Sequence, residues 1–331
     1  MIGTALDTVL DRAVVPGYTR LGYRIRRSIF KPPALPSMDG KVVLVTGATS
    51  GVGLAAAEGF AQLGASVRLL ARSEERGERA RAQVLAASGN EDVRVSIGDL
   101  SDLGSVRRFA ARFAQETGRL DVLVNNAGVL TPERMLSAEG IELTFATNVL
   151  GPFLLTKLLI PPLELSAPSR IINVSSGGMY TQRLHVDDLQ SEAGDFDGAT
   201  AYARTKRAGV ILTELWAQRL WNTGVVVHAM HPGWVDTPGL ESSLPRFYTL
   251  TRPLLRTPRE GADTILWLGA APEPATSSGR FWHDRRERPT NRAPWTRDTL
   301  ADRERLWAEC ERLTESHTVA PRSIAPDSRT P

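Results

Sequence analysis

The sequence predicts an α/β protein with one doubly wound parallel sheet, and three observations support this class. From residue 41 onward, short apolar runs alternate with helical segments of roughly 10–20 residues, as in successive βαβ units. The runs are continuously apolar, as expected when helices cover both faces of a sheet. The first run ends in glycines that open a helix, which is the arrangement of the Rossmann fold.

Length and composition indicate a single domain with extensions. The 331 residues are 42% hydrophobic and 23% charged, which is enough to bury a core. We expect an amphipathic arm and linker over residues 1–37, a Rossmann-fold domain over residues 38–285 and a polar tail over residues 286–331. Within the tail we expect one helix near residues 296–315 and a disordered end rich in Ser, Pro and Arg.

Each element of the domain is expected where its residue pattern is clearest. Apolar runs predict strands at residues 41–47, 66–72, 92–99, 121–128, 170–176 and 225–233, with a further strand at 279–284. The intervening segments predict helices at residues 51–63, 73–88, 102–117, 138–165 and 200–222. Residues 240–256, rich in Leu, Phe and Tyr, are expected to cover the binding pocket as a lid.

The arm carries the charge imbalance of the chain. Residues 1–37 hold six basic and two acidic side chains, a sum of +4, whereas the whole chain is +3, so the remainder sums to −1. Because the main domain shows no basic face, we predict no nucleic-acid partner. Two short amphipathic helices are expected in the arm, separated at Pro16 and Gly17.

Two interpretations of the arm remain open. In the first, residues 1–30 lie on an anionic membrane surface, with Arg20, Arg24 and Arg27 as a basic row. In the second, the arm docks on the domain and its arginines face water. The chain shows no signal-peptide pattern, no apolar stretch of 18 residues and a single cysteine, Cys310, so we expect a cytoplasmic protein. The five histidines form no convincing ligand set, so no metal site is expected.

A glycine-rich turn follows the first predicted strand. Glycines let the backbone approach a pyrophosphate closely, and the helix that follows offers free N–H groups and the positive end of its dipole. We therefore expect this turn to bind a dinucleotide. The residues assigned to this contact are Thr46, Gly47, Ser50, Gly51, Val52 and Gly53.

The end of the second predicted strand indicates which dinucleotide is preferred. A carboxylate there binds the 2′-OH of NAD, whereas an arginine accommodates the 2′-phosphate of NADP. This strand ends in Ala71, Arg72 and Ser73, without an acid. We therefore predict NADP as the preferred cofactor, with NAD as the alternative.

Tyr202 and Lys206 form a candidate acid–base pair. Their spacing on a predicted helix places them on one face, so the ammonium group is expected to lower the pKa of the phenol. Ser175 and Ser176 end a predicted strand at the edge where such sheets bind ligands, and a hydroxyl there can hold a reacting carbonyl. Asn148, a polar residue in an apolar helix, is either a hydrogen-bonding group of the core or part of a proton relay.

Taken together, these motifs resemble the short-chain dehydrogenase/reductase family over about residues 40–285. The resemblance implies further cofactor contacts at Asp99, Leu100, Asn126, Ala127, Gly128, Pro232, Gly233 and Thr237. The segments SSGGM, DDLQSE and HPGWVDTPG are also similar to those of one vertebrate subgroup of the family. One departure is the separation of 26 residues between Ser176 and Tyr202, which leaves the choice between Ser175 and Ser176 open.

The resemblance implies an NAD(P)-dependent oxidoreductase that interconverts a carbonyl and an alcohol. Tyr202 would exchange the substrate proton, Lys206 would lower the pKa of the tyrosine and bind the nicotinamide ribose, Ser176 would hold the substrate oxygen, and Asn148 would support a water relay. The apolar lid predicts a lipid-like substrate, and the two long apolar helices predict a homodimer or homotetramer. The alternative function is a dinucleotide-binding scaffold or redox sensor without turnover, which the intact Tyr202–Lys206 pair disfavours.

Overall fold

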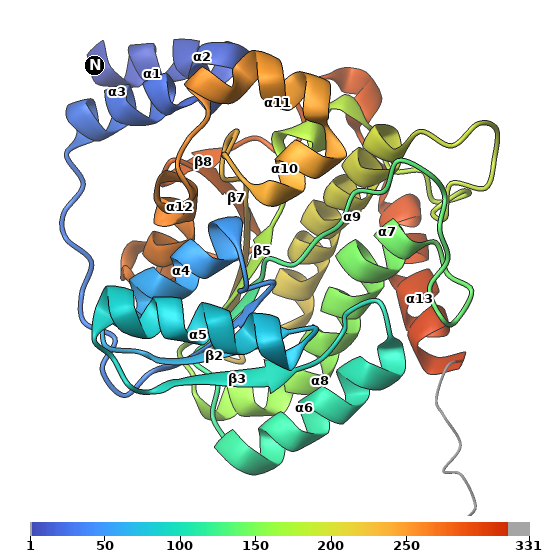
Figure 1. The fold of residues 1–331 in the computed structure, drawn as a ribbon. Helices are drawn as coiled ribbons and strands as arrows, with labels where there is room; N and C mark the ends of the chain where they lie inside the picture. Colours follow the sequence, from blue (N-terminus) through green and yellow to red (C-terminus); the bar gives the residue numbers. More distant parts are fainter. Residues whose placement is uncertain (1, 317–331) are drawn as a thin grey trace, which may run out of the picture.

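The computed structural model of the protein describes residues 2–316 and is built around one eight-stranded sheet (Figure 1). The strand order is β3-β2-β1-β4-β5-β6-β7-β8, and neighbouring strands are parallel except for β7 and β8. The strands are β1 (Val42–Thr46), β2 (Ser66–Ala71), β3 (Val93–Ile97), β4 (Val122–Asn125), β5 (Ser169–Val174), β6 (Val225–Met230), β7 (Arg280–His283) and β8 (Arg286–Arg288). The predicted doubly wound sheet is confirmed, and its order reverses between β1 and β4.

Helices cover both faces of this sheet (Figure 1). The helices of the domain are α4 (Gly51–Gln62), α5 (Glu74–Ser88), α6 (Leu103–Thr117), α7 (Leu143–Phe145), α8 (Gly151–Leu165), α9 (Gly198–Arg219), α10 (Pro238–Ser243), α11 (Pro245–Thr251), α12 (Pro258–Ala270) and α13 (Leu300–Ser316). Helix α4 packs against α5 and α12, and α6 packs against α8. Because the central strands are apolar on both sides, two large hydrophobic clusters form, one under each helical layer.

The predicted strands occur where expected, but β4 and β6 end three residues early, at Asn125 and Met230. The residues that follow leave the sheet and form loops at its carboxyl edge. The helix predicted from residue 138 begins only at Leu143, because the Glu142 carboxylate caps it by accepting hydrogen bonds from the N–H groups of Thr144 (2.8 Å) and Phe145 (2.6 Å).

A turn of π-helix, Ala146–Leu150, interrupts this helical segment and contains Asn148. Such turns often occur at functional sites. Within the described residues, Leu143–Leu165 is the one helical segment that is long and apolar enough to cross a membrane, but 72% of the relevant window is buried inside the fold. Its apolar side chains therefore serve the core on one face of the sheet.

The arm folds into α1 (Ile2–Arg12), α2 (Val14–Tyr18) and α3 (Arg20–Phe30), which lie near α11 at the top of Figure 1. The helical breaks fall at Ala13 and Thr19, so the predicted separation at Pro16 and Gly17 is wrong. Pro16 lies in the first turn of α2, where the missing N–H does not interrupt a helical hydrogen bond.

Buried charges fasten the arm to the domain. Arg26 is 2% exposed and donates hydrogen bonds to Asp7 Oδ1 of α1 (2.8 Å) and to Asp284 Oδ2 beyond β7 (2.7 Å). Arg256, which is also buried, binds Asp284 Oδ1 (2.5 Å) and the carbonyl oxygen of Gly17 (3.1 Å). The arm is therefore an integral layer of the molecule rather than a separate segment.

The predicted basic row of the arm also faces the domain in part. Arg20 lies 3.2 Å and Arg24 lies 3.8 Å from carboxylate oxygens of Glu260, and Arg27 lies 3.1 Å from Asp263 Oδ1. Both acids belong to α12. The docked arrangement is thus the one that the structure shows, and these arginines pair with acids while their side chains stay partly exposed to water.

The region predicted as a polar tail is largely built into the domain. Strand β8 pairs with β7, and α13 packs on the helical layer through Trp307, whose ring centroid lies 4.6 Å from that of Trp216 and 4.9 Å from that of Phe153. Composition concealed this role because only one face of α13 is apolar and buried. The Ser-, Pro- and Arg-rich end, residues 317–331, lies outside the described residues.

Helix α13 also bears on the predicted assembly. It contacts α9 and the π-turn before α8. The apolar surfaces of α8 and α9 are the ones that predicted a homodimer or homotetramer. Leu306 and Cys310 of α13 are fully buried there. Because α13 of the same chain covers part of this apolar surface, the surface gives less support to a homodimer or homotetramer. The oligomeric state remains a prediction.

Candidate active site

The glycine-rich turn between β1 and α4 lies at the carboxyl edge, beside the reversal of strand order. Gly47 and Gly51 have positive φ angles of 62° and 55°, which other residues rarely adopt. Position 53 has no room for a side chain, because a Cβ on Gly53 would lie 2.3 Å from Gly47 O and 2.4 Å from Asn126 Nδ2. The predicted set is completed by Ser50 at the N-cap of α4 and Val52 in its first turn. The result is a backbone cradle at a helix N-terminus, which suits a pyrophosphate.

Hydrogen bonds join this turn to the loop after β4. The hydroxyl of Thr46 accepts the backbone N–H groups of Asn126 (2.9 Å) and Ala127 (3.0 Å). In return, Asn126 Nδ2 donates to Thr46 O (2.9 Å). The structure therefore brings two of the sequence-predicted cofactor segments together and fixes their relative position.

The predicted adenosine contacts lie at the ends of β2 and β3. Asp99 Oδ1 accepts hydrogen bonds from the backbone N–H (2.9 Å) and the hydroxyl (2.7 Å) of Ser101, which fix the carboxylate, and Leu100 is buried. Arg72 directly follows β2 and is exposed. Within residues 2–316 its guanidinium forms no hydrogen bond or ion pair, so it is available to an anion at this edge.

The two candidate serines have different partners. Ser175 is buried, and its hydroxyl donates to the carbonyl oxygen of Lys206 (3.0 Å). Ser176 precedes the short 3-10 helix Gly177–Thr181, and its hydroxyl accepts the N–H of Gly178 (3.2 Å). Ser176 also interacts with the side chain of Tyr202, so its hydroxyl is the one that faces the phenol.

Tyr202 and Lys206 share a face of α9, with Lys206 Nζ 5.4 Å from the centroid of the tyrosine ring. The expected lowering of the phenol pKa is not seen: burial raises the pKa of Tyr202 to about 12, and the contact with Ser176 offsets only part of this. Burial lowers the pKa of Lys206 to about 8. The Lys206 ammonium donates to Val174 O of β5 (2.9 Å), so its hydrogen bond goes to the sheet and not to the phenol.

Asn148 sits where three segments converge. Its Oδ1 accepts the N–H of Val129 (2.8 Å), and its Nδ2 donates to Val129 O (2.9 Å) and to Thr205 Oγ1 (3.0 Å). A Cβ on Gly128 would lie 3.2 Å from both Asn148 Oδ1 and Lys206 Nζ. The π-turn, the loop after β4 and helix α9 therefore present their polar groups to one point.

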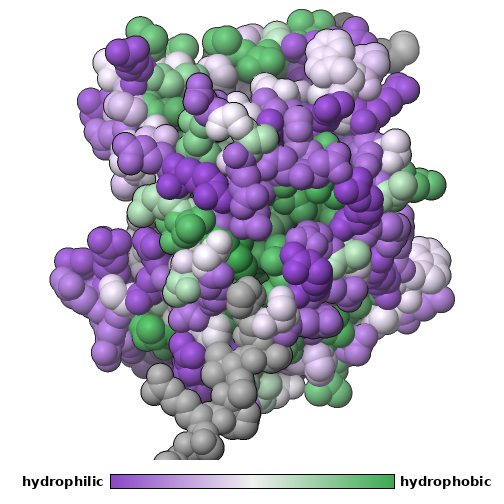
Figure 2. All heavy atoms as spheres, turned by 90° about the vertical axis from the view of Figure 1, so that its right-hand side faces the viewer, coloured by the Kyte–Doolittle hydropathy of each residue, from purple (hydrophilic) through white to green (hydrophobic). Residues whose placement is uncertain are grey.

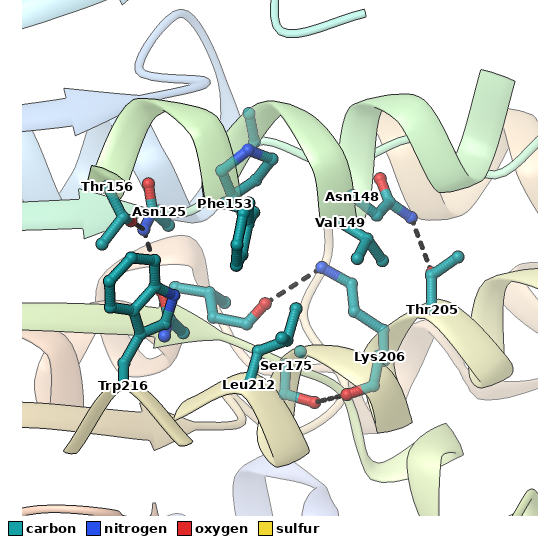
Figure 3. Close-up of a pocket in the computed structure, with 15 residues that line it drawn as sticks. Asn125, Asn148, Val149, Phe153, Thr156, Ser175, Thr205, Lys206, Leu212 and Trp216 are labelled. Atoms are coloured by element: carbon teal, nitrogen blue, oxygen red, sulfur yellow. Dashed lines mark hydrogen bonds between the residues drawn. The ribbon is translucent and has the colours of Figure 1, made fainter. Parts of the chain in front are cut away.

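A small cavity lies behind this point, between α8 and α9 (Figure 3). Its volume is about 40 Å³, and Lys206, Asn148, Asn125 and Thr156 contribute polar atoms to its wall. The buried Asn125 Oδ1 has no hydrogen-bond partner among the described residues. The cavity is large enough for one water molecule, and apolar side chains such as Phe153, Leu212 and Trp216 also line it.

The loop after β6 faces the glycine-rich turn. It contains Pro232, Gly233, which has a φ of 82°, and Thr237, which caps α10 by accepting the N–H of Leu240 (3.2 Å). The Thr237 Cγ2 atom lies 2.9 Å from the position that a Cβ on Gly51 would take. The last predicted cofactor segment thus reaches the N-terminus of α4.

The segment predicted as a lid forms α10 and α11 above the carboxyl edge (Figure 1). It is held by Trp234, whose ring stands at 87° to that of Phe247 with centroids 4.9 Å apart, and by a hydrogen bond from the Tyr248 hydroxyl to Asp236 (2.9 Å). Aromatic side chains therefore connect the loop after β6 to the lid.

Sequence reasoning missed Tyr18 and Arg256, which also reach this edge. Arg256 Nε donates to Tyr18 O (3.0 Å), and Arg256 Nη1 donates to Pro232 O (3.2 Å). No local motif marks either residue, and a buried arginine cannot be told from a solvated one in a chain with 36 of them. Only the tertiary structure brings residues 18 and 256 together.

Two buried histidines, His231 and His283, pack against each other. His231 and His283 stack with centroids 3.8 Å apart, and burial lowers the pKa of both, so they are neutral at pH 7. Within residues 2–316, no group of three or more His, Cys, Asp or Glu side chains is arranged to hold a metal ion.

Comparison with known proteins identifies the family of this chain. The family model described as short chain dehydrogenase matches residues 41–246. The chain belongs to this family. It is 44% identical over 276 residues to dehydrogenase/reductase SDR family member 12 of Bos taurus. The alignment covers 83% of this chain and 86% of that protein, and it confirms the predicted subgroup. Retinol dehydrogenase 12 of Homo sapiens is 38% identical over 279 residues, covering 83% of this chain and 87% of that protein.

Solved structures agree with this placement. The Pseudomonas aeruginosa RhlG/NADP active-site complex superimposes with a TM-score of 0.62 at 26% identity, covering 74% of this chain and 94% of that one. The 3-ketoacyl-(acyl-carrier-protein) reductase of Brucella melitensis, complexed with NADH, gives a TM-score of 0.60 at 26% identity, with 74% and 96% coverage. The protein is therefore an oxidoreductase of the short-chain dehydrogenase family that uses a nicotinamide dinucleotide.

Proposed function

We propose that the protein interconverts a carbonyl and an alcohol through Ser176, Tyr202 and Lys206. The observation that carries this proposal is that the Ser176 hydroxyl faces the Tyr202 phenol, with Lys206 on the same face of α9. Ser175 is the weaker candidate, because its hydroxyl is bonded to Lys206 O. Ser176 holds the substrate oxygen, and Tyr202 gives a proton to that oxygen or takes one from it.

The raised pKa of Tyr202 suits the reductive direction, because the phenol keeps its proton at neutral pH and can donate it. The nicotinamide, when bound, supplies or accepts the hydride. Lys206 binds the nicotinamide ribose, and its charge stabilises the phenolate that is left behind. Asn148 and the cavity beside Lys206 offer a water path that returns a proton to the site.

We also propose that NADP(H) is preferred over NAD(H). The support is Arg72, an exposed guanidinium at the end of β2 with no partner within residues 2–316. A guanidinium binds a phosphate through charge-assisted, often bidentate, hydrogen bonds. The two solved neighbours bind NADP and NADH respectively, so the fold alone does not decide the preference.

The substrate that we propose is apolar. The lid contributes Phe247 and contacts Trp234 at the carboxyl edge, and several relatives are retinol dehydrogenases. The test is oxidation of NADPH, followed by absorbance, with all-trans-retinal, medium-chain aldehydes and short water-soluble ketones. We expect the apolar aldehydes to react fastest. Tight binding of NADPH without turnover of any carbonyl would favour the dinucleotide-binding scaffold instead.

We propose in addition that the top of the molecule touches a membrane surface peripherally. Along the upper edge of Figure 2, green, hydrophobic residues are interspersed with purple, hydrophilic ones. Since several arm arginines pair with α12, the contact would rest mainly on aliphatic side chains. The exposed ones of the arm and lid are Leu6, Val9, Val14, Val15, Leu21, Leu250 and Leu254.

Co-sedimentation with anionic vesicles tests this surface. The double variant Val14→Asp/Val15→Asp should remain in the supernatant while the wild type pellets. This variant is preferable to removal of the arm, which would expose the buried Arg256 and Asp284. Equal sedimentation of variant and wild type would reject the membrane contact and leave the arm with a structural role.

A further inference from the structure

We propose that Tyr18 of the arm is a positioning residue of the active site. Its ring fills the space between the loop that carries Ser176 and the loop that carries Gly233, and so fixes the separation of these loops. The inference rests on the proposed function, because it assumes that the two loops hold the substrate oxygen and the nicotinamide.

The first contact is with the serine loop. The Tyr18 ring lies so close to Gly177, the residue after Ser176, that a Cβ on this glycine would be 2.5 Å from Tyr18 Cε2 and 3.1 Å from Cδ2. Tyr18 is itself only 3% exposed. Glycine at position 177 is therefore required by the close approach of the arm, and the ring limits how far the serine loop can move toward it.

The second contact is with the loop after β6. The carbonyl oxygen of Tyr18 accepts the N–H of Trp234 (2.8 Å). A Cβ on the neighbouring Gly233 would lie 2.6 Å from that same oxygen. The Tyr18 ring also packs edge-on against His231, with centroids 4.5 Å apart. One arm residue thus touches both loops.

The ring makes the contacts with Gly177 and His231, the backbone carbonyl oxygen makes those with Trp234 and Gly233, and none of them uses the hydroxyl. The buried Tyr18 hydroxyl has no hydrogen-bond partner among the described residues. Removing it should therefore cost little, because no bond is broken and no partner is left unsatisfied. Tyr18→Phe keeps the ring, whereas Tyr18→Leu removes the flat surface that lies against Gly177.

The position of Tyr18 is itself held firmly. Arg256 binds Tyr18 O and Asp284, and Asp284 also binds Arg26 of the arm. A loosened Tyr18 would let the serine loop and the loop after β6 shift independently. Displacements of about 1 Å in such geometry can reduce a rate by about 10²-fold.

The test compares Tyr18→Leu and Tyr18→Phe with the wild type, using the carbonyl substrate that the wild type reduces fastest. We expect Tyr18→Leu to lower kcat by about 10- to 100-fold while its Kd for NADPH, from fluorescence titration, changes by less than about 3-fold. Tyr18→Phe should stay within about 2-fold of the wild type in both quantities. With NADPH deuterated at the transferred position, the isotope effect on kcat should grow for Tyr18→Leu only.

A control and a measurement without cofactor separate positioning from stability. Leu10→Ala removes a buried side chain of α1 and should lower the melting temperature, but leave kcat within about 2-fold. In the protein alone, amide hydrogen exchange over residues 175–181 should quicken in Tyr18→Leu and remain unchanged in Tyr18→Phe.

The outcomes are distinct. An active wild type with unchanged kcat in Tyr18→Leu would overturn this inference alone. Equal losses in Tyr18→Phe and Tyr18→Leu would overturn it as well, because they would assign the effect to the hydroxyl. Failure of the wild type to reduce any carbonyl would overturn the proposed function and this inference with it.

Discussion

Replacing Asp284 with asparagine is predicted to loosen the arm and destabilise the fold. Asp284 has a φ of 52°, in the left-handed region that asparagine tolerates better than most residues. The substitution therefore removes the negative charge without adding backbone strain. The Asp284 side chain is 4% exposed and lies between the buried guanidinium groups of Arg26 and Arg256, so the charge that is lost is a buried one.

The magnitude follows from the contacts. Asp284 accepts hydrogen bonds from Arg26 Nη1 (2.7 Å), Arg256 Nη1 (2.5 Å) and Arg256 Nη2 (2.9 Å). Removing one partner of a buried ion pair typically costs about 3–5 kcal/mol, because the other charge stays buried and uncompensated. Asparagine keeps one acceptor oxygen, and Asp7 still binds Arg26, so we expect a loss of about 3 kcal/mol in the free energy of unfolding.

The same contact gives a pH dependence. The neighbouring guanidinium groups hold the pKa of Asp284 far below its ordinary value, despite the opposing effect of burial. A carboxyl with a depressed folded-state pKa contributes stability that is present above its unfolded pKa of about 4 and is lost as the pH falls toward the folded value. The difference in stability between the wild type and Asp284→Asn should therefore shrink below about pH 4.

Urea unfolding followed by tryptophan fluorescence measures this loss. The control is Glu75→Gln, which removes an ion pair with Arg79 (3.1 Å) whose two side chains are 79% and 65% exposed. Exposed pairs contribute at most about 1 kcal/mol. If Asp284→Asn were no more destabilising than this control, the reasoning about the buried arm contact would be refuted.

Two further predictions concern the cofactor. Arg72→Ala should weaken NADPH binding by at least about 10-fold more than NADH binding in a fluorescence titration, since only NADPH carries the 2′-phosphate, and equal losses would contradict this. Gly53→Ala should abolish binding of either dinucleotide, because its Cβ would lie 2.3 Å from Gly47 O. The control Gly209→Ala places a Cβ where no atom lies within 4 Å, so it should leave binding intact. If both variants bound the dinucleotides equally well, the assignment of the glycine-rich turn as the binding cradle would be contradicted.

The sequence was sufficient where local pattern decides structure. The apolar runs located the strands, and the spacing of Tyr202 and Lys206 placed both on one face of α9. The start of the helix containing Asn148 was misplaced, because the cap supplied by Glu142 has no distinctive local signal. The pKa of Tyr202 was predicted in the wrong direction, because burial and the turn of Lys206 toward Val174 are properties of packing.

Other features depended on contacts between distant segments. Helix α13 reads as polar, and only the packing of Trp307 on Trp216 shows that one face belongs to the core. The role of Tyr18 depends on Gly177 and Trp234, which are far along the chain. Such long-range contacts leave no periodicity or motif by which a single sequence would reveal them.

The most direct test of the proposed chemistry is the turnover of Tyr202→Phe. This substitution removes the hydroxyl that faces Ser176 and leaves the ring in place. We predict that kcat for carbonyl reduction falls by at least about 10²-fold, the usual effect of losing a general acid, while the Kd for NADPH stays within about 3-fold of the wild type. Wild-type turnover in Tyr202→Phe on the same substrate would contradict the assignment of Tyr202 as the proton donor.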